Sequence, residues 1–147
     1  MTLLILLIAI AAGAANPFQS GTNAELNKQL GAPLWTAILV YASGLIGVLL
    51  LQLLFRQSLP ASSRVAAIPA WAWAGGIISI LPTLAGLTFA QRLGAGIFTG
   101  VSVTAALVCS ILLDHFALAG FRQHPASPAR IAGGALMIVG LWIITRT

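Results

Sequence analysis

Residues 3–29 read LLILLIAIAAGAANPFQSGTNAELNKQ, an apolar segment that runs directly into one rich in amides and hydroxyls. At helical spacing, one face of this segment carries Asn16, Gln19, Ser20, Asn23 and Asn27. If the helix enters a bilayer at its first residue, Asn16 and Gln19 lie about 22 to 28 Å along it. An unpaired polar group at that depth costs several kcal/mol, so this face must look into protein or water. A translocation pathway needs such a face.

The composition indicates a protein that has lipid as its solvent. Of 147 residues, 59% are hydrophobic and only 6% are charged, whereas about a quarter of a soluble domain is charged. The net charge of +5 comes from basic residues scattered singly along the chain. Without a Lys/Arg cluster there is no track for phosphates, so we expect a lipid bilayer and no nucleic acid as partner.

The apolar segments predict an all-α integral membrane protein, a bundle of five transmembrane helices in a single domain, 1–147. Each of the first four segments is long enough to cross the hydrocarbon layer of roughly 30 Å. The fifth is short, and the first is expected to continue as helix to Gln29. The predicted spans are 2–23, 34–55, 68–90, 93–113 and 131–145.

The N-terminal segment has a second interpretation. Leu3–Ile10 followed by small residues is similar to the apolar core and cleavage site of a secretory signal peptide. Such a peptide normally begins with a positively charged region, and here no Lys or Arg precedes the apolar run. We therefore favour a retained first span.

The basic residues of the loops are almost evenly divided between the two sides of the membrane. With the N-terminus on side A, four lie on side A and three on side B: Arg56, Arg64, Arg122 and Arg130 against Lys28, Arg92 and Arg146. An excess of Lys and Arg on one side normally fixes orientation. Two interpretations follow, one fixed orientation or insertion in both orientations with antiparallel pairing. We favour the second.

Short motifs are distributed along nearly the whole chain. They are Pro17-x-Gln19-x-x-x-Asn23-x-x-Leu26, Gly31-x-Pro33, Gly44, Trp71-x-Trp73-x-Gly75-Gly76, Gly94, Asp114-His115-Phe116, Arg130-x-x-Gly133 and Gly140. Together they resemble the five-span YdcZ-type proteins of the drug/metabolite transporter superfamily. The resemblance implies half of a ten-span transporter, a small-molecule substrate, an antiparallel homodimer and a location in the bacterial inner membrane. One departure is Ala105-Ala106, where the family often has Gly-Gln.

Two prolines predict bends that could serve as hinges. Pro17 has no N–H to bond the carbonyl of Gly13, and its ring crowds that turn. Pro82 likewise frees the carbonyl of Ile78 in the third span, beside Ser79. Each bend could expose a carbonyl for a ligand or allow movement, or could be a static kink.

Aromatic residues begin two of the spans. Trp35 and Trp142 are predicted to anchor their helices at the membrane interface, where Trp is enriched. Trp71 precedes Gly75-Gly76 by one turn and is a candidate wall for an aromatic or cationic substrate, with the interfacial role as the alternative.

Small residues predict where helices meet. Gly96-x-x-x-Gly100-x-x-x-Thr104 forms a ridge of small side chains on the fourth span. Gly133 and Gly140 form a second flat stripe on the fifth. Either stripe could pack within the subunit or across a dimer.

The ionisable residues argue against enzymes, metal sites and proton coupling by a buried acid. Only Glu25 and Asp114 are acidic, and both lie near span ends. His115 and His124 straddle a loop, so we expect no metal, no cofactor and no catalytic residue. An interfacial Asp114-His115 pair is expected to anchor the fourth span.

These observations predict a small-molecule transporter that works by alternating access as a dual-topology homodimer. The candidate substrate-binding residues are Asn16, Gln19, Ser20, Asn23, Trp71 and Ser79. The alternative is a non-transporting membrane subunit that assembles with or regulates a larger complex.

Overall fold

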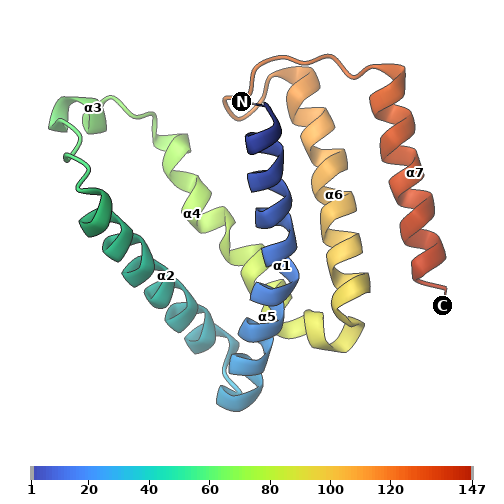
Figure 1. Cartoon of the computed structure of the whole chain (residues 1–147), viewed down its shortest axis with the longest axis horizontal. Coiled ribbons are helices and arrows are strands. Elements are labelled where there is room, and N and C mark those ends of the chain that lie inside the picture. Colours follow the sequence, from blue (N-terminus) through green and yellow to red (C-terminus); the bar gives the residue numbers. More distant parts are fainter. Residues whose placement is uncertain (1, 147) are drawn as a thin grey trace. The chain divides into compact units, whose positions relative to one another are not determined.

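A computed structural model describes residues 2–146 of the chain, and this part contains helices and no β-strand. Figure 1 shows the order of the elements along the chain. They are α1 (Thr2–Leu30), α2 (Pro33–Phe55), α3 (Ser62–Ala66), the 3-10 helix η1 (Ala70–Trp73), α4 (Ala74–Ile78), α5 (Ile80–Leu93), α6 (Ala95–Phe116) and α7 (Pro128–Ile144). The all-helical fold is confirmed.

Four segments are long and apolar enough to cross a membrane, namely α1, α2, the segment Ala70–Leu93 and α6. The apolar helix α7 has 17 residues, so it is about 25 Å long and just short of the hydrocarbon thickness. The first helix ends at Leu30, one residue beyond the predicted Gln29. The segment 93–113 is displaced, because Leu93 still belongs to α5 and the turn lies at Gly94.

The chain forms two compact units. The central unit comprises residues 18–91, and the terminal unit comprises residues 2–17 and 92–146 of the described chain. The chain passes from one unit to the other after Pro17, inside α1, and after Gln91, near the end of α5. The predicted single domain stays a prediction, and each unit is described by itself.

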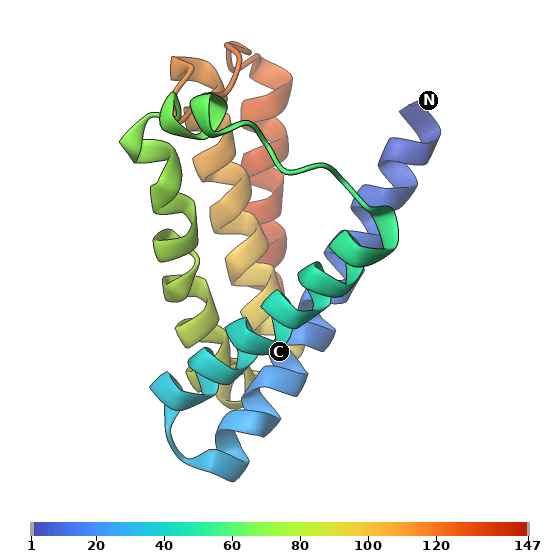
Figure 2. The ribbon, with the colours of Figure 1, turned by 90° about the vertical axis from the view of Figure 1, so that its left-hand side faces the viewer.

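In the central unit, a tight turn joins α1 to α2. Gly31 has φ +64°, a conformation that glycine adopts without strain, and its N–H bonds the carbonyl of Asn27 at 2.8 Å. Pro33 then begins α2 at a position where its missing N–H has no consequence. Figure 2 shows this turn and the extended linker from α2 to α3. Thr36, in the first turn of α2, and Leu87, in α5, are buried.

In the terminal unit, α6 and α7 pack against each other, joined by the loop seen in Figure 1. A Cβ atom added at Gly100 would lie 3.1 Å from Leu141 Cδ1, and one added at Gly134 would lie 3.5 Å from Ile111 Cδ1. Gly134 and Thr104 are buried. The fourth-span ridge therefore packs within the subunit at Gly100.

The other small residues predicted to pack have open space around them within the described chain. An added Cβ at Gly96, Gly133 or Gly140 would meet nothing within 4 Å. In α7 the close approach to α6 is made by Gly134, one residue after the predicted Gly133. The predicted role of Gly96, Gly133 and Gly140 in a dimer stays a prediction.

Candidate functional site

The amide-rich face lies on one uninterrupted helix, α1, and one of its five polar residues has a structural role. Asn27 Nδ2 donates to the carbonyl of Leu87 at 3.1 Å, and Asn27 Oδ1 lies 3.3 Å from the Thr36 hydroxyl, which can donate to it. Thr36 Oγ1 is also 3.0 Å from the carbonyl of Ala32. Since Thr36 is fully buried, these contacts join α1, α2 and α5 at their polar ends.

The remaining members of the stripe make no such contacts. The side chains of Gln19, Ser20 and Asn23 form no hydrogen bond with any group of the central unit, residues 18–91. Asn16 forms none with the described part of the terminal unit. Ser20 and Asn23 are half-buried, whereas Asn16 and Gln19 are exposed. Within their own units, the polar groups of these four side chains are therefore left for a ligand, for water or for a second copy of the chain.

A cluster of three hydroxyls lies where the third span is interrupted. The Tyr41 hydroxyl is 2.9 Å from Ser79 Oγ and 2.9 Å from Thr83 Oγ1. Ser79 Oγ donates to the carbonyl of Gly76 at 2.6 Å, and Thr83 Oγ1 donates to the carbonyl of Ser79 at 2.9 Å. We call Tyr41, Ser79 and Thr83 the hydroxyl cluster.

Tyr41 is absent from the candidate residues of the sequence analysis. It is the only tyrosine of the chain, and it lies in the apolar run of α2. Its hydroxyl within a predicted span is a signal that could have identified it, because a hydroxyl in hydrocarbon needs a hydrogen-bond partner. The candidate residue Ser79 is brought together with it.

The two predicted bends have different outcomes. The third span is interrupted at Ser79, between α4 and α5, four residues before Thr83 and three before Pro82. This interruption agrees with the loss of the Pro82 N–H as a donor to Ile78. By contrast, α1 continues through Gly13 and Pro17 without a break. The boundary between the two compact units nevertheless falls directly after Pro17.

The tryptophans are largely exposed. Trp71 lies in the short helix η1 with 60% of its surface exposed, and Trp35 is 66% exposed. Trp142 carries the guanidinium of Arg146 over its ring, at 4.6 Å from the ring centroid. A cation over an exposed ring at a helix end fits the expected interfacial anchor at Trp142. Trp71 as a substrate wall stays a prediction.

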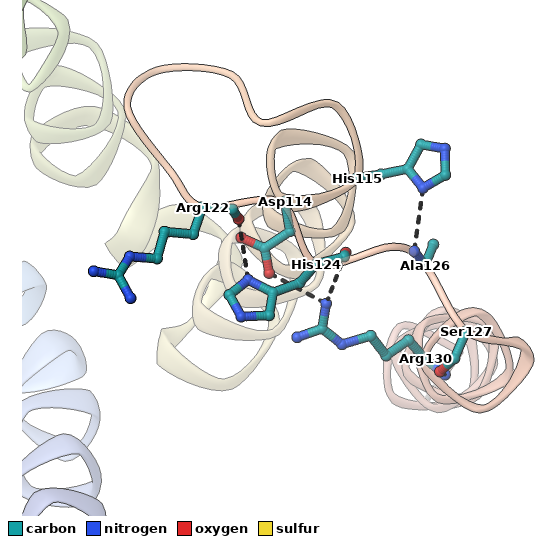
Figure 3. Close-up of polar contacts among 7 residues, drawn as sticks. All are labelled: Asp114, His115, Arg122, His124, Ala126, Ser127 and Arg130. Atoms are coloured by element: carbon teal, nitrogen blue, oxygen red, sulfur yellow. Dashed lines mark hydrogen bonds and ion pairs between the residues drawn. The ribbon is translucent and has the colours of Figure 1, made fainter.

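The acid of the fourth span is bound to the start of α7. Arg130 Nη1 lies 3.3 Å from Asp114 Oδ2 and also donates to the carbonyl of His124 at 3.3 Å. The Ala126 N–H donates to His115 Nδ1 at 3.1 Å, so the proton of a neutral His115 is on Nε2. In Figure 3 the Arg130 guanidinium points toward Asp114, while the side chain of Arg122 points away.

These contacts close the α6–α7 loop. Asp114 and His115 turn to different partners, as expected for adjacent helical residues. Among residues 2–146, no three His, Cys, Asp or Glu side chains are grouped so that they could hold a metal ion. Ser127 Oγ accepts from the Arg130 N–H at 3.3 Å and caps the first turn of α7.

The fold and the polar face of α1 define a multi-pass helical membrane protein with unpaired amides on an apolar helix. The chain belongs to the family described as "Putative inner membrane exporter, YdcZ", whose sequence model matches residues 4–143. No curated protein and no solved structure matches the chain. The family and the apolar helices locate the protein in the inner membrane as a multi-pass protein, and the family description indicates transport, not an enzyme.

Proposed function

We propose that this protein exports a small molecule by alternating access, as a homodimer of two oppositely inserted copies. The observation that carries the proposal is the unpaired amide face of α1, formed by Asn16, Gln19, Ser20 and Asn23. In hydrocarbon these groups cost free energy unless a partner satisfies them. A substrate that exchanges water for these amides at the bilayer midplane would be such a partner.

A pathway needs two copies of the chain, because one subunit supplies few polar groups near the bilayer midplane. Antiparallel pairing would bring the amide faces of two α1 helices toward a shared pathway. The almost even distribution of basic residues, four on one side and three on the other, supports insertion in both orientations. The open faces at Gly133 and Gly140 are suited to helix contact between copies.

Alternating access requires positions at which the subunit can bend. Pro17 lies at the boundary between the two compact units, and the second crossing of that boundary follows Gln91. The interruption at Ser79 gives the third span a further flexible point. Bending at Pro17 would move the terminal unit against the central unit while each keeps its own packing. In a homodimer the two access states are equal in energy by symmetry, so gradients set the direction of transport.

The test compares spent medium from cells that produce equal amounts of wild-type protein and of Asn23→Leu. Untargeted mass spectrometry of the medium suits this comparison, because it detects exported compounds of any class. We expect at least one compound to accumulate outside cells with the wild type and to return to the vector-only level with Asn23→Leu. The leucine side chain keeps a similar volume and removes the amide.

Thr22→Val is the matched control on the same helix. Its hydroxyl already bonds the carbonyls of Phe18 and Gln19 within α1, at 3.1 and 3.0 Å, so the substitution should leave export unchanged. If no compound depends on Asn23 while the protein folds and inserts, the amide face is not a pathway. The non-transporting membrane subunit would then be the better account.

A further inference from the structure

The hydroxyl cluster has fewer protons than contacts. Tyr41, Ser79 and Thr83 each carry one hydroxyl proton, and the three oxygens make four contacts of 2.6 to 2.9 Å. Thr83 donates its proton to the Ser79 carbonyl, and Ser79 donates its proton to the Gly76 carbonyl. Tyr41 donates its proton to one of its two hydroxyl partners, so every proton of the cluster already has an acceptor. What the cluster can still offer to a ligand is therefore oxygen lone pairs.

The local backbone adds further acceptor capacity. Pro82 cannot donate to the carbonyl of Ile78, which lies directly before Ser79 in the sequence. The carbonyl of Ser79 lies 3.3 Å from the Thr83 N–H and 2.9 Å from the Thr83 hydroxyl. The break in the third span thus brings several oxygens close to the hydroxyl cluster.

The cluster lies well within two of the candidate membrane spans. Tyr41 follows the start of α2 at Pro33 by eight residues, which is about 12 Å along the helix. Ser79 follows the start of its segment at Ala70 by nine residues, about 14 Å at the same rise. Tyr41 is 39% exposed and Ser79 and Thr83 are half-buried, so a molecule in the membrane interior can reach the oxygens.

The charges of the central unit favour an uncharged ligand. Its one acidic residue, Glu25, lies near the end of α1, bonds Gln29 at 2.8 Å and lies 3.6 Å from Lys28. Its basic residues, Lys28, Arg56 and Arg64, lie near helix ends or in linkers. A charged ligand at the hydroxyl cluster would meet no counter-ion there, and its desolvation would be uncompensated.

We propose that the hydroxyl cluster is a binding subsite for the hydroxyl or N–H group of a neutral, largely apolar substrate. The inference rests on the proposed transport function and narrows the substrate class to uncharged hydrogen-bond donors. The lone pairs of Tyr41 and its two partners would accept the donor, and the apolar side chains of α2 would cover the rest of the molecule.

The single tyrosine allows a direct test with the full-length protein in detergent. Ultraviolet resonance Raman bands of the phenol ring report the hydrogen-bonding state of Tyr41 alone. The probes are benzamide and N,N-dimethylbenzamide, which share the ring and the carbonyl but differ in N–H donors, with indole and 1-methylindole as a second pair. We expect the donor of each pair to half-saturate the Tyr41 signal at a concentration roughly two- to tenfold lower than its methylated partner, the effect of one net hydrogen bond.

Two variants and one control make the expected result specific. In the double variant Ser79→Ala with Thr83→Val, two of the three acceptor oxygens are removed and the Tyr41 proton becomes free to donate, so the preference for N–H donors should fall clearly below that of the wild type. The single variant Thr83→Val should give an intermediate preference. Thr88→Val is the matched control, because Thr88 lies on the same helix and bonds only the carbonyl of Leu84, at 2.8 Å. It should keep the wild-type preference.

Equal half-saturation within both probe pairs, or a donor preference as large in the double variant as in the wild type, would overturn this inference. Its failure can be distinguished from failure of the proposed function. If export depends on Asn23 but the protein shows no donor preference, only the proposed hydroxyl subsite is wrong. If the protein prefers donors at Tyr41 but exports nothing, the ligand site stands and the proposed transport mechanism is wrong.

Discussion

The amide of Asn27 donates to the backbone carbonyl of Leu87 at 3.1 Å, across sixty residues of sequence. This bond gives Asn27 a structural role that the other polar residues on its helix face do not have. Its neighbour Leu87 is buried, with 3% of its surface exposed. Asn27 therefore stabilises the central unit, whereas Asn23, one turn earlier, has no partner there.

Asn27→Leu should destabilise the protein, because the Leu87 carbonyl and the Thr36 hydroxyl lose a partner in a buried region. We expect a loss of about 1 to 3 kcal/mol in the free energy of unfolding. The measurement is a denaturation curve in mixed detergent micelles. Asn23→Leu is the matched control and should change stability by less than about 0.5 kcal/mol. Equal losses in the two variants would contradict the division of the amide face into structural and free residues.

Gly100→Val should weaken the packing of α6 against α7. The new side chain begins 3.1 Å from Leu141 Cδ1, and overpacking of this kind costs typically about 1 to 3 kcal/mol. Gly96→Val introduces the same residue one turn earlier on α6, where an added Cβ meets nothing. Denaturation curves of the two variants should therefore differ, with Gly100→Val the less stable. The reverse order would place the contact face of α6 elsewhere.

Asp114→Asn should have a small effect, because its ion pair with Arg130 is partly solvent-exposed. The side chains of Arg130 and Asp114 are 44% and 24% exposed, and such pairs contribute at most about 1 kcal/mol. A double-mutant cycle with Arg130→Gln measures the coupling directly. If export is established, Asp114→Asn should also leave its pH dependence unchanged. A lost or shifted pH dependence would assign Asp114 a role in proton coupling.

Pro17→Ala should restrict movement between the two compact units, since alanine restores an N–H that can bond the Gly13 carbonyl. Spin labels at Ser58 in the central unit and at Gln123 in the terminal unit report the spread of distances between them. We expect a narrower distribution in Pro17→Ala than in the wild type. Phe18→Ala, which leaves the backbone bonds of α1 intact, should keep the wild-type width. If the distance distribution keeps its width in Pro17→Ala, Pro17 does not act as a hinge.

Much of the architecture follows from local sequence. The length of α1, the turn at Gly31 and Pro33, and the interruption near Pro82 depend on spacing and backbone chemistry within a few residues. The turn lies at Gly94 and not in the gap between the predicted spans 68–90 and 93–113, and this too has a local cause, because Gly94 adopts φ +80°.

The contacts between distant segments could not be predicted in the same way. Asn27 and Asn23 are chemically identical, and only the Leu87 carbonyl, a backbone group with no sequence signature, distinguishes them. Gly134, and not Gly133, lies close to α6, and this depends on the rotation of α7 about its own axis. The partners of Tyr41 lie in another helix, although a lone hydroxyl in the apolar run of α2 was a visible signal.

The central claim is that two oppositely inserted copies form the transporter, and topology in intact cells tests it most directly. In a Cys109→Ala background, single cysteines are introduced at Ser58, on side A, and at Gln29, on side B, and are labelled with an impermeant thiol reagent before and after lysis. The account predicts that about half of the molecules label from outside at each position. Complete labelling at one position and none at the other would fix a single orientation and contradict the inverted homodimer.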